Sequence, residues 1–398
     1  MTSNPTSAQA PLGVTAPRGF RAAGVTAGLK ASGKPDVALV VNDGPMKSAA
    51  AVFTTNRVAA APVHWSRQAV SDGRADAVVL NSGGANACTG HQGFQNTHAT
   101  AEHVAAVLGV SSGDVLVCST GLIGEQLPMD KLLPGVDAAS KALGDGGPND
   151  GGAAAATAIM TTDSVSKQSG FAGSGYSIGG MAKGAGMLAP GLATMLVVLT
   201  TDAAVGAPEL DAALRAATRV SFDRADSDGC MSTNDTVVLL ASGASGTTPD
   251  PAEFAEGLTA VCTDLATQLI HDAEGAAHDI TIRTHNAATE ADAEEVGRAV
   301  ARSNLFKTAI FGLDPNWGRV LSAVGTTRAA FEPERLNVAI NGVQVCRDGG
   351  IGDDRSLVDL GGREVLVEID LGAGSSEASI WTNDLTHEYV HENSAYSS

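Results

Sequence analysis

Residues 183–195 read Lys183-Gly-Ala-Gly-Met-Leu-Ala-Pro-Gly-Leu-Ala-Thr-Met195, and the rest of this 398-residue chain is organised around them. The stretch contains three glycines, one proline and one hydroxyl residue, Thr194, and an apolar run from Met195 to Leu199 follows it. Turn-forming residues before a short apolar run predict a loop that leads into a buried β-strand. Thr194 is expected at the first position of that strand.

A hydroxyl at the start of a strand can cut its own chain. The Thr194 hydroxyl can attack the Ala193 carbonyl, and when the chain breaks the new α-amine of Thr194 becomes the base for its own hydroxyl. The same residues also fit a plain glycine-rich turn followed by a strand that begins with threonine. Composition alone leaves both interpretations open.

Charge and cysteine content exclude several functions. The formal net charge of −19 argues against nucleic-acid binding, which needs a basic surface. The cysteines are odd in number, widely spaced and without a CxxC pair, which is typical of a reduced intracellular protein rather than of a disulfide framework or a zinc site. They are Cys88, Cys118, Cys230, Cys262 and Cys346.

The chain shows neither a targeting segment nor a membrane span. Met1 to Ala10 has no basic start and no apolar run, so we expect no signal peptide. No apolar run approaches the roughly 18 residues that a membrane-spanning helix needs. We therefore expect a soluble, cytoplasmic protein with no membrane partner, in which residues 1–12 form a disordered tail.

Apolar periodicity predicts the main elements. We expect strands over residues 37–41, 49–53, 76–80, 114–118, 195–199, 237–241, 365–371 and 378–382, with a hairpin over 336–345. We expect helices over residues 97–108, 127–143, 208–220, 251–270 and 291–302, the second of them broken by Pro134. Residues 164–182 are expected to form a variable loop.

The strand over residues 114–118 runs into Ser119-Thr120-Gly121. A strand that ends in Thr-Gly offers a hydroxyl and a neighbouring backbone N–H that point the same way, and such a pair can stabilise a developing oxyanion. Thr-Gly turns are also common without any function, so the two residues by themselves do not decide the matter.

The run His387-Glu-Tyr-Val-His391 matches HExxH, the zinc-protease signature in which two histidines one helical turn apart hold the metal. The signature needs a helix and a third ligand, yet only seven residues follow His391, and Ile380-Trp-Thr with Tyr-Val favours strand over helix. A zinc hydrolase that uses His387 and His391 stays as an alternative of different chemistry. Our expectation is no metal and no cofactor.

Several separated motifs resemble the ornithine acetyltransferase family, also called glutamate N-acetyltransferase. The resemblance runs from about residue 13 to residue 398. Its motifs are Asn-Ala-Cys-Thr-Gly at 86–90, Thr-Gly at 120–121, Thr-Thr-Asp at 161–163, Lys-Gly-Ala-Gly-Met with Ala-Thr-Met-Leu at 183–196, Glu-Gly at 274–275, Asp-Pro-Asn-Trp-Gly-Arg at 314–319 and the tail from Glu388 to Ser398.

The resemblance implies a fold and an assembly. The fold is mixed α/β, with helices outside stacked, packed sheets in helix–sheet–sheet–helix layers. Cleavage between Ala193 and Thr194 separates an alpha segment, 13–193 after the tail, from a beta segment, 194–398, whose smaller C-terminal lobe spans roughly 280–385. The two segments stay interwoven, and two of each form a heterotetramer.

The resemblance also assigns roles to residues. Thr194 is the nucleophile, and Thr120 and Gly121 form the oxyanion pair. The family often ends in threonine where this chain has serine, which keeps the hydroxyl and the terminal carboxylate. The residues that match substrate contacts are Thr162, Lys183, Thr194, Glu274, Asn393 and Ser398.

The implied reaction moves an acetyl group from N2-acetyl-L-ornithine to L-glutamate through acetyl-Thr194, as part of arginine biosynthesis. By charge, Lys183 suits a substrate carboxylate and Glu274 an ornithine ammonium. The sequence leaves open whether acetyl-CoA is also a donor, which would make the enzyme bifunctional. It also leaves open an N-terminal-threonine amidase or aminopeptidase of similar fold, because hydrolysis differs only in that water takes the ester.

Overall fold

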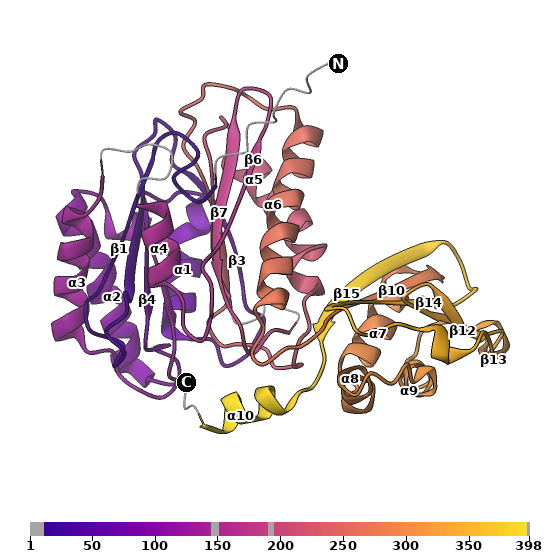
Figure 1. The fold of residues 1–398 in the computed structure, drawn as a ribbon. Helices are drawn as coiled ribbons and strands as arrows, with labels where there is room; N and C mark the ends of the chain where they lie inside the picture. Colours follow the sequence, from indigo (N-terminus) through magenta and orange to yellow (C-terminus); the bar gives the residue numbers. More distant parts are fainter. Residues whose placement is uncertain (1–11, 145–150, 190–194, 396–398) are drawn as a thin grey trace, which may run out of the picture.

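The computed structural model describes residues 12–144, 151–189 and 195–395, and within these ranges the strands form three sheets (Figure 1). Ala193, Thr194, Ser398 and nearly all of the expected N-terminal tail lie outside the described residues. Two of the sheets stack in a layered body, and the third belongs to a smaller C-terminal lobe beside it.

The first sheet has the order β1-β2-β4-β5, with β4 and β5 parallel and the other neighbours antiparallel. Every residue of β2, β4 and β5 is buried. These strands are continuous apolar runs because both faces of the sheet are covered. The bounds are Phe20–Val25 for β1, Val37–Asn42 for β2, Ala77–Ser82 for β4 and Val115–Thr120 for β5.

The second sheet has the order β3-β9-β8-β7-β6, with β8 and β9 parallel. Its β6–β7 hairpin corrects the variable loop expected over 164–182. Glycine, serine and alanine give these strands no apolar signature, yet β7 is almost wholly buried and β6 is partly buried, with α6 packed on both strands. The bounds are Ser48–Phe53 for β3, Lys167–Ala172 for β6, Ser177–Lys183 for β7, Leu196–Thr201 for β8 and Thr236–Ala241 for β9.

Helices cover the outer face of each sheet, which confirms the expected mixed α/β layers (Figure 1). Helices α2 and α3 cover the first sheet, and α5 and α6 cover the second, while α1 packs on β5 and α4 on β1. The bounds are Ala61–Ala69 for α1, Gly90–Leu108 for α2, Met129–Lys141 for α3, Gly152–Ala158 for α4, Ala207–Arg219 for α5 and Pro251–His271 for α6.

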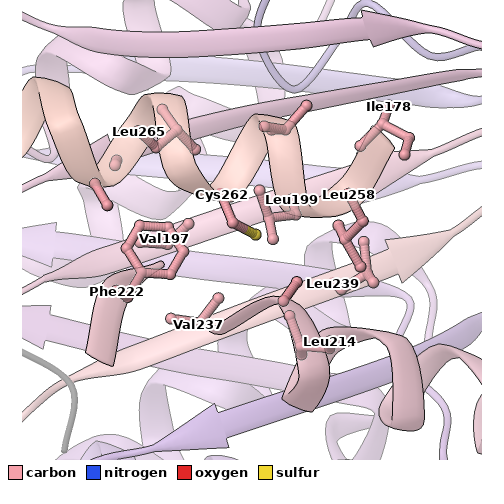
Figure 2. Packing of buried hydrophobic residues seen from close by; sticks show 14 of the residues in the cluster. Ile178, Val197, Leu199, Leu214, Phe222, Val237, Leu239, Leu258, Cys262 and Leu265 are labelled. Carbon is pink, nitrogen blue, oxygen red and sulfur yellow. The ribbon is translucent and has the colours of Figure 1, made fainter. Parts of the chain in front are cut away.

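Separate apolar clusters fill the spaces between these layers. Figure 2 shows the one between the second sheet and α5 and α6, where side chains from the strands meet those of the two helices. Its labelled residues are Ile178, Val197, Leu199, Leu214, Phe222, Val237, Leu239, Leu258, Cys262 and Leu265.

Helix α3 runs without a break through Pro134, so the predicted interruption there is wrong. A proline inside a helix removes one backbone hydrogen bond and crowds the preceding turn. The buried face of α3, which includes Leu132, Val136 and Ala139, packs on the first sheet and offsets that cost.

The C-terminal lobe is built on a sheet of order β13-β12-β11-β14-β10-β15 with its own apolar cluster. As expected from the Asn-Gly pair, Asn341 and Gly342 take positive φ angles of 46° and 80° in the β11–β12 turn. Strand bounds are Asp279–Ala287 for β10, Asn337–Ile340 for β11, Val343–Arg347 for β12, Gly350–Ile351 for β13, Glu364–Asp370 for β14 and Ser376–Asn383 for β15. Helix bounds are Glu290–Ala301 for α7, Asn304–Phe311 for α8 and Trp317–Val324 for α9.

The chain leaves β15 and runs back beneath the layered body as helix α10, His387–Ala395 (Figure 1). We predicted strand rather than helix for the HExxH run, and this prediction is wrong. The Asp384 carboxylate accepts the N–H groups of Ala277 and His278, both at 3.0 Å, and so holds the chain where the strand stops. The Thr386 hydroxyl then caps the helix by accepting the Tyr389 N–H at 2.9 Å.

Across the part of the chain that the structure describes, no helix is both long enough and apolar enough to cross a membrane.

Candidate active site

The ends of strands from both stacked sheets meet at one place. Lys183 at the end of β7 pairs with Leu196 at the start of β8, and Leu196 pairs with Thr236 at the start of β9. From the first sheet, β5 ends at Thr120, and the Lys183 Nζ atom lies 3.4 Å from the Thr120 Oγ1 atom. The cation and the hydroxyl singled out from the sequence are therefore neighbours.

Lys183 is 1% exposed. Burial lowers its pKa, and the negative charges of Asp163, Asp235 and Glu274 oppose that shift. The three carboxylates favour the ammonium form of Lys183, and in so buried a place the field of a cation acts strongly on any anion that enters.

Asp163 joins a second buried lysine, Lys167, to the backbone of the glycine loop. Its Oδ1 atom accepts the Gly184 N–H at 2.6 Å and the Lys167 ammonium at 2.7 Å. Burial alone would raise the pKa of Asp163, but the charges of Lys183 and Lys167 outweigh it and bring the pKa to about 2. Thr162, which is partly buried, is the residue directly before Asp163 in this turn.

The Thr120–Gly121 pair depends on a close backbone approach. Gly121 has a φ angle of 126°, and a Cβ atom there would lie 2.6 Å from the Gly84 nitrogen, so only glycine fits. The Gly84 N–H donates to the Thr120 carbonyl at 3.0 Å, and the Thr120 hydroxyl faces Lys183. Sequence reasoning identified this pair without locating the cation beside it.

Asp235 is a site residue that sequence reasoning missed. It is completely buried directly before β9, and its Oδ1 atom accepts the Met195 N–H at 3.0 Å. Among the described residues no donor meets hydrogen-bond geometry at its Oδ2 atom, and burial raises its pKa well above 3.8 against the opposing effects of the Met195 N–H, the Ser232 side chain and Lys183. The sequence does contain a signal for this residue, namely an aspartate directly before the apolar run Val237 to Ala241. A carboxyl at that position is buried together with the strand that follows it.

Glu274 lies against the glycine loop from the other side. Its N–H donates to the Ala185 carbonyl at 3.0 Å, and a Cβ atom at Gly186 would lie 2.6 Å from its Oε2 atom. The Asn393 side chain on α10 donates to the same Oε2 atom at 3.0 Å. Tertiary structure thus brings Lys183, Glu274 and Asn393 around one loop.

The HExxH histidines lie on α10, the helix that also carries Asn393. The His387 ring packs edge-on against Phe311, with centroids 5.4 Å apart. In the described ranges no group of three or more His, Cys, Asp or Glu side chains is arranged to hold a metal ion. The zinc-hydrolase alternative therefore finds no third ligand there.

A hydroxyl beside a buried lysine, at the edge of two stacked mixed sheets, is an arrangement suited to acyl transfer, because both groups can stabilise an oxyanion. The chain belongs to the ArgJ family, whose model matches residues 21–398.

Relatives of known name match nearly the whole chain. The arginine biosynthesis bifunctional protein ArgJ of Streptomyces coelicolor is 66% identical over 387 residues, which are 97% of this chain and 100% of that protein. The protein of the same name from Thermobifida fusca is also 66% identical, with the same coverage. The chain is therefore an acyltransferase that acts in arginine biosynthesis, by acetyl transfer.

A solved structure is also similar. It is ornithine acetyltransferase complexed with ornithine from Mycobacterium tuberculosis, 54% identical with a TM-score of 0.42, and the match covers 47% of this chain and 97% of that one.

Proposed function

We propose that this chain cuts itself between Ala193 and Thr194 and then carries acetyl groups from N2-acetyl-L-ornithine to L-glutamate on the Thr194 hydroxyl. The observation that carries the proposal is the 3.4 Å approach of Lys183 Nζ to Thr120 Oγ1. It lies where β8 starts at Leu196, two residues after Thr194 in the chain.

Self-cleavage begins when the Thr194 hydroxyl attacks the Ala193 carbonyl carbon. The C–N bond between the two residues breaks, and the proton lost by the hydroxyl ends on the nitrogen. Water then hydrolyses the ester, which releases the Ala193 carboxylate and restores the hydroxyl beside a free α-amine.

Acetyl transfer reuses the same hydroxyl. An α-amine has an unperturbed pKa of about 7.7–8.0, so a useful fraction is neutral near pH 7 and can take the hydroxyl proton. The oxygen attacks the acetyl carbonyl, ornithine leaves with the proton on its amine, and an acetyl ester remains. The glutamate amine then attacks that ester and regenerates Thr194.

The surrounding groups divide the work by charge. The Thr120 hydroxyl and the Gly121 N–H stabilise the oxyanion, and the buried Lys183 ammonium binds the substrate carboxylate. Glu274, held by Asn393, binds the side-chain ammonium of ornithine. Thr162 and Ser398 complete the contacts to the substrate.

The pairing of strands supports an assembly that survives the cut. After cleavage, β8 and β9 belong to the beta segment, yet β8 pairs with β7 and β9 pairs with β3, both from the alpha segment. Separating the segments would therefore tear the second sheet at two places. We propose that segments 1–193 and 194–398 stay interwoven and that two such pairs form a heterotetramer in the cytoplasm. The lobe at roughly 280–385 is part of segment 194–398.

A second donor is a further part of the proposal. The relatives of 66% identity are named bifunctional, which favours acetyl-CoA as an additional source of the acetyl group for glutamate. An amidase or aminopeptidase of similar fold would instead pass the ester to water. The ratio of N-acetylglutamate to free acetate formed from acetylornithine separates the two outcomes.

The deciding experiment measures the intact mass of the purified protein under denaturing conditions and sequences the N-terminus of each chain. We expect two chains, the second beginning Thr194-Met195-Leu196, and parallel double-reciprocal plots for acetylornithine and glutamate. Thr194→Ala should remain one chain and be inactive. Full activity in an unbroken wild-type chain would refute the mechanism.

A further inference from the structure

The loop that leads from β7 toward the cleavage position contains a strained residue. Met187 has a φ angle of +54°, in the left-handed region that long side chains rarely adopt. Such a conformation persists only where neighbouring contacts hold it in place.

Asp228 and its neighbour hold Met187 and the residue after it. The Asp228 Oδ2 atom accepts the Met187 N–H at 2.7 Å, and the Ser227 N–H donates to the Leu188 carbonyl at 2.6 Å. The other carboxylate oxygen of Asp228 accepts the Cys230 N–H at 3.1 Å. We call Ser227 and Asp228 the loop clamp.

The C-terminal lobe anchors the loop clamp. The buried Lys307 ammonium on α8 donates to the Ser227 carbonyl, and the Ser227 hydroxyl donates to Asn383 Oδ1 at 2.9 Å. Directly before the clamp, the Asp226 N–H donates to the Trp381 carbonyl at 2.8 Å. The clamp is thus fixed to β15 and α8, and it acts on the segment that precedes residue 190.

We propose that Asp228 is a positioning residue for self-cleavage, which holds Met187 in the left-handed conformation and so fixes residues 183–189, the described part of the loop that leads to the scissile bond. This inference rests on the proposed function. A chain held on one side of a reacting peptide spends more of its time in the geometry that allows attack, and fixed geometry of this kind can change rates by large factors. The C-terminal lobe thereby takes part in maturation through Lys307.

The test compares cleavage rates of full-length precursors, followed as intact mass against time after a short pulse of expression. Asp228→Ala should slow cleavage at least tenfold, because Met187 loses the acceptor for its N–H. Met187→Gly should cleave within about threefold of wild type, since glycine adopts positive φ without steric cost. The double variant should cleave at least threefold faster than Asp228→Ala, a rescue that a merely structural role of Asp228 does not explain.

Asp250→Ala is the matched control. Asp250 accepts the backbone N–H groups of Ala252 and Glu253, both at 3.0 Å, but it does so at the start of α6, away from the loop. It should cleave at the wild-type rate. If Asp228→Ala fails to fold, Asp228→Asn is compared with and without Met187→Gly, because asparagine keeps a weaker, neutral acceptor. We expect Asp228→Asn to cleave more slowly than wild type and Met187→Gly to restore part of the rate.

The inference is overturned if the Asp228 variant that folds cleaves at the wild-type rate, or if Met187→Gly does not speed its cleavage. Either result leaves the proposed function standing. A wild-type chain that never cuts itself overturns both.

Discussion

Two buried aspartates stand at opposite ends of β8, and their surroundings differ. Asp202 follows the last residue of the strand, and its oxygens accept the N–H groups of Ser177 at 2.7 Å and Arg18 at 3.2 Å. Asp235 lies beside the first residues of the strand, where one oxygen accepts the Met195 N–H and the other is unbonded in the described part of the chain.

The difference teaches how to separate a structural carboxylate from a functional one. Both are at most 3% exposed, so burial does not distinguish them. A buried polar atom normally finds a partner, and one that lacks a partner points to strain or function. The end of β8 with the incomplete hydrogen bonding is also the end with Lys183 and the cleavage position.

The largest expected effect concerns the buried cation at the start of β8. Lys183→Met should lower kcat/KM for acetyl transfer by roughly 10³-fold, because losing a charged partner in a buried site costs about 4 kcal/mol. Arg18→Met, which removes a cation at the other end of the strand, should stay within about threefold of wild type. Equal losses in the two variants would erase the distinction between the ends.

The second largest effect is expected from the Thr120 hydroxyl, which lies beside Lys183. Thr120→Ala should reduce kcat by roughly 10²–10³-fold with little change in ornithine binding, since it removes one oxyanion donor. Ser119→Ala is the matched control, because its hydroxyl donates instead to Asn81 at 2.6 Å. Steady-state kinetics of both variants test this prediction. A kcat for Thr120→Ala close to that of Ser119→Ala would contradict the role of Thr120 as an oxyanion donor.

A substitution of Asp202, at the opposite end of β8, should lower the stability of the fold without changing self-cleavage. Asp202→Ala leaves the N–H groups of Ser177 and Arg18 without their acceptor, which should lower the free energy of unfolding by about 2 kcal/mol. Urea unfolding in the Thr194→Ala background, where every chain is uncut, measures this loss. Self-cleavage of Asp202→Ala should proceed at the wild-type rate, and a cleavage defect would assign this end a function.

The smallest effect is a pH dependence from Asp235. Its folded pKa is raised above the unfolded value of 3.8, so its favourable contribution is complete below pH 3.8 and is lost as pH rises through the folded pKa. Asp235→Asn carries no such proton, and the stability of the wild-type protein relative to this variant should fall by up to about 1.4 kcal/mol per pH unit within that window.

Urea unfolding between pH 4 and pH 8, again in the Thr194→Ala background, tests the Asp235 prediction. Parallel pH profiles for the two proteins would mean that Asp235 is ionised in the folded state. Its free oxygen would then need a cationic partner, and Lys183 is the charged side chain that acts on it most directly.

Local patterns in the sequence determined the strands that build the site. The run Val237–Ala241 lies within β9, and the strand that ends in Thr120–Gly121 is β5, because an unbroken apolar run between turn residues has few other stable arrangements. The same reasoning failed at α10: the Thr386 cap on the Tyr389 N–H is local, but the contacts of Asp384 that hold the end of β15 come from partners distant in the sequence.

Only the tertiary structure decided which charges meet. Lys183 faces Thr120 across 63 positions of the chain, and Asp235 reaches Met195 across 40. These contacts depend on the register between strands from distant segments and on the stacking of two sheets. Neither can be predicted from the residues next to Lys183 or Asp235 in the sequence. The sequence specified the chemical groups, and the packing of the sheets brought them together in a place that excludes water.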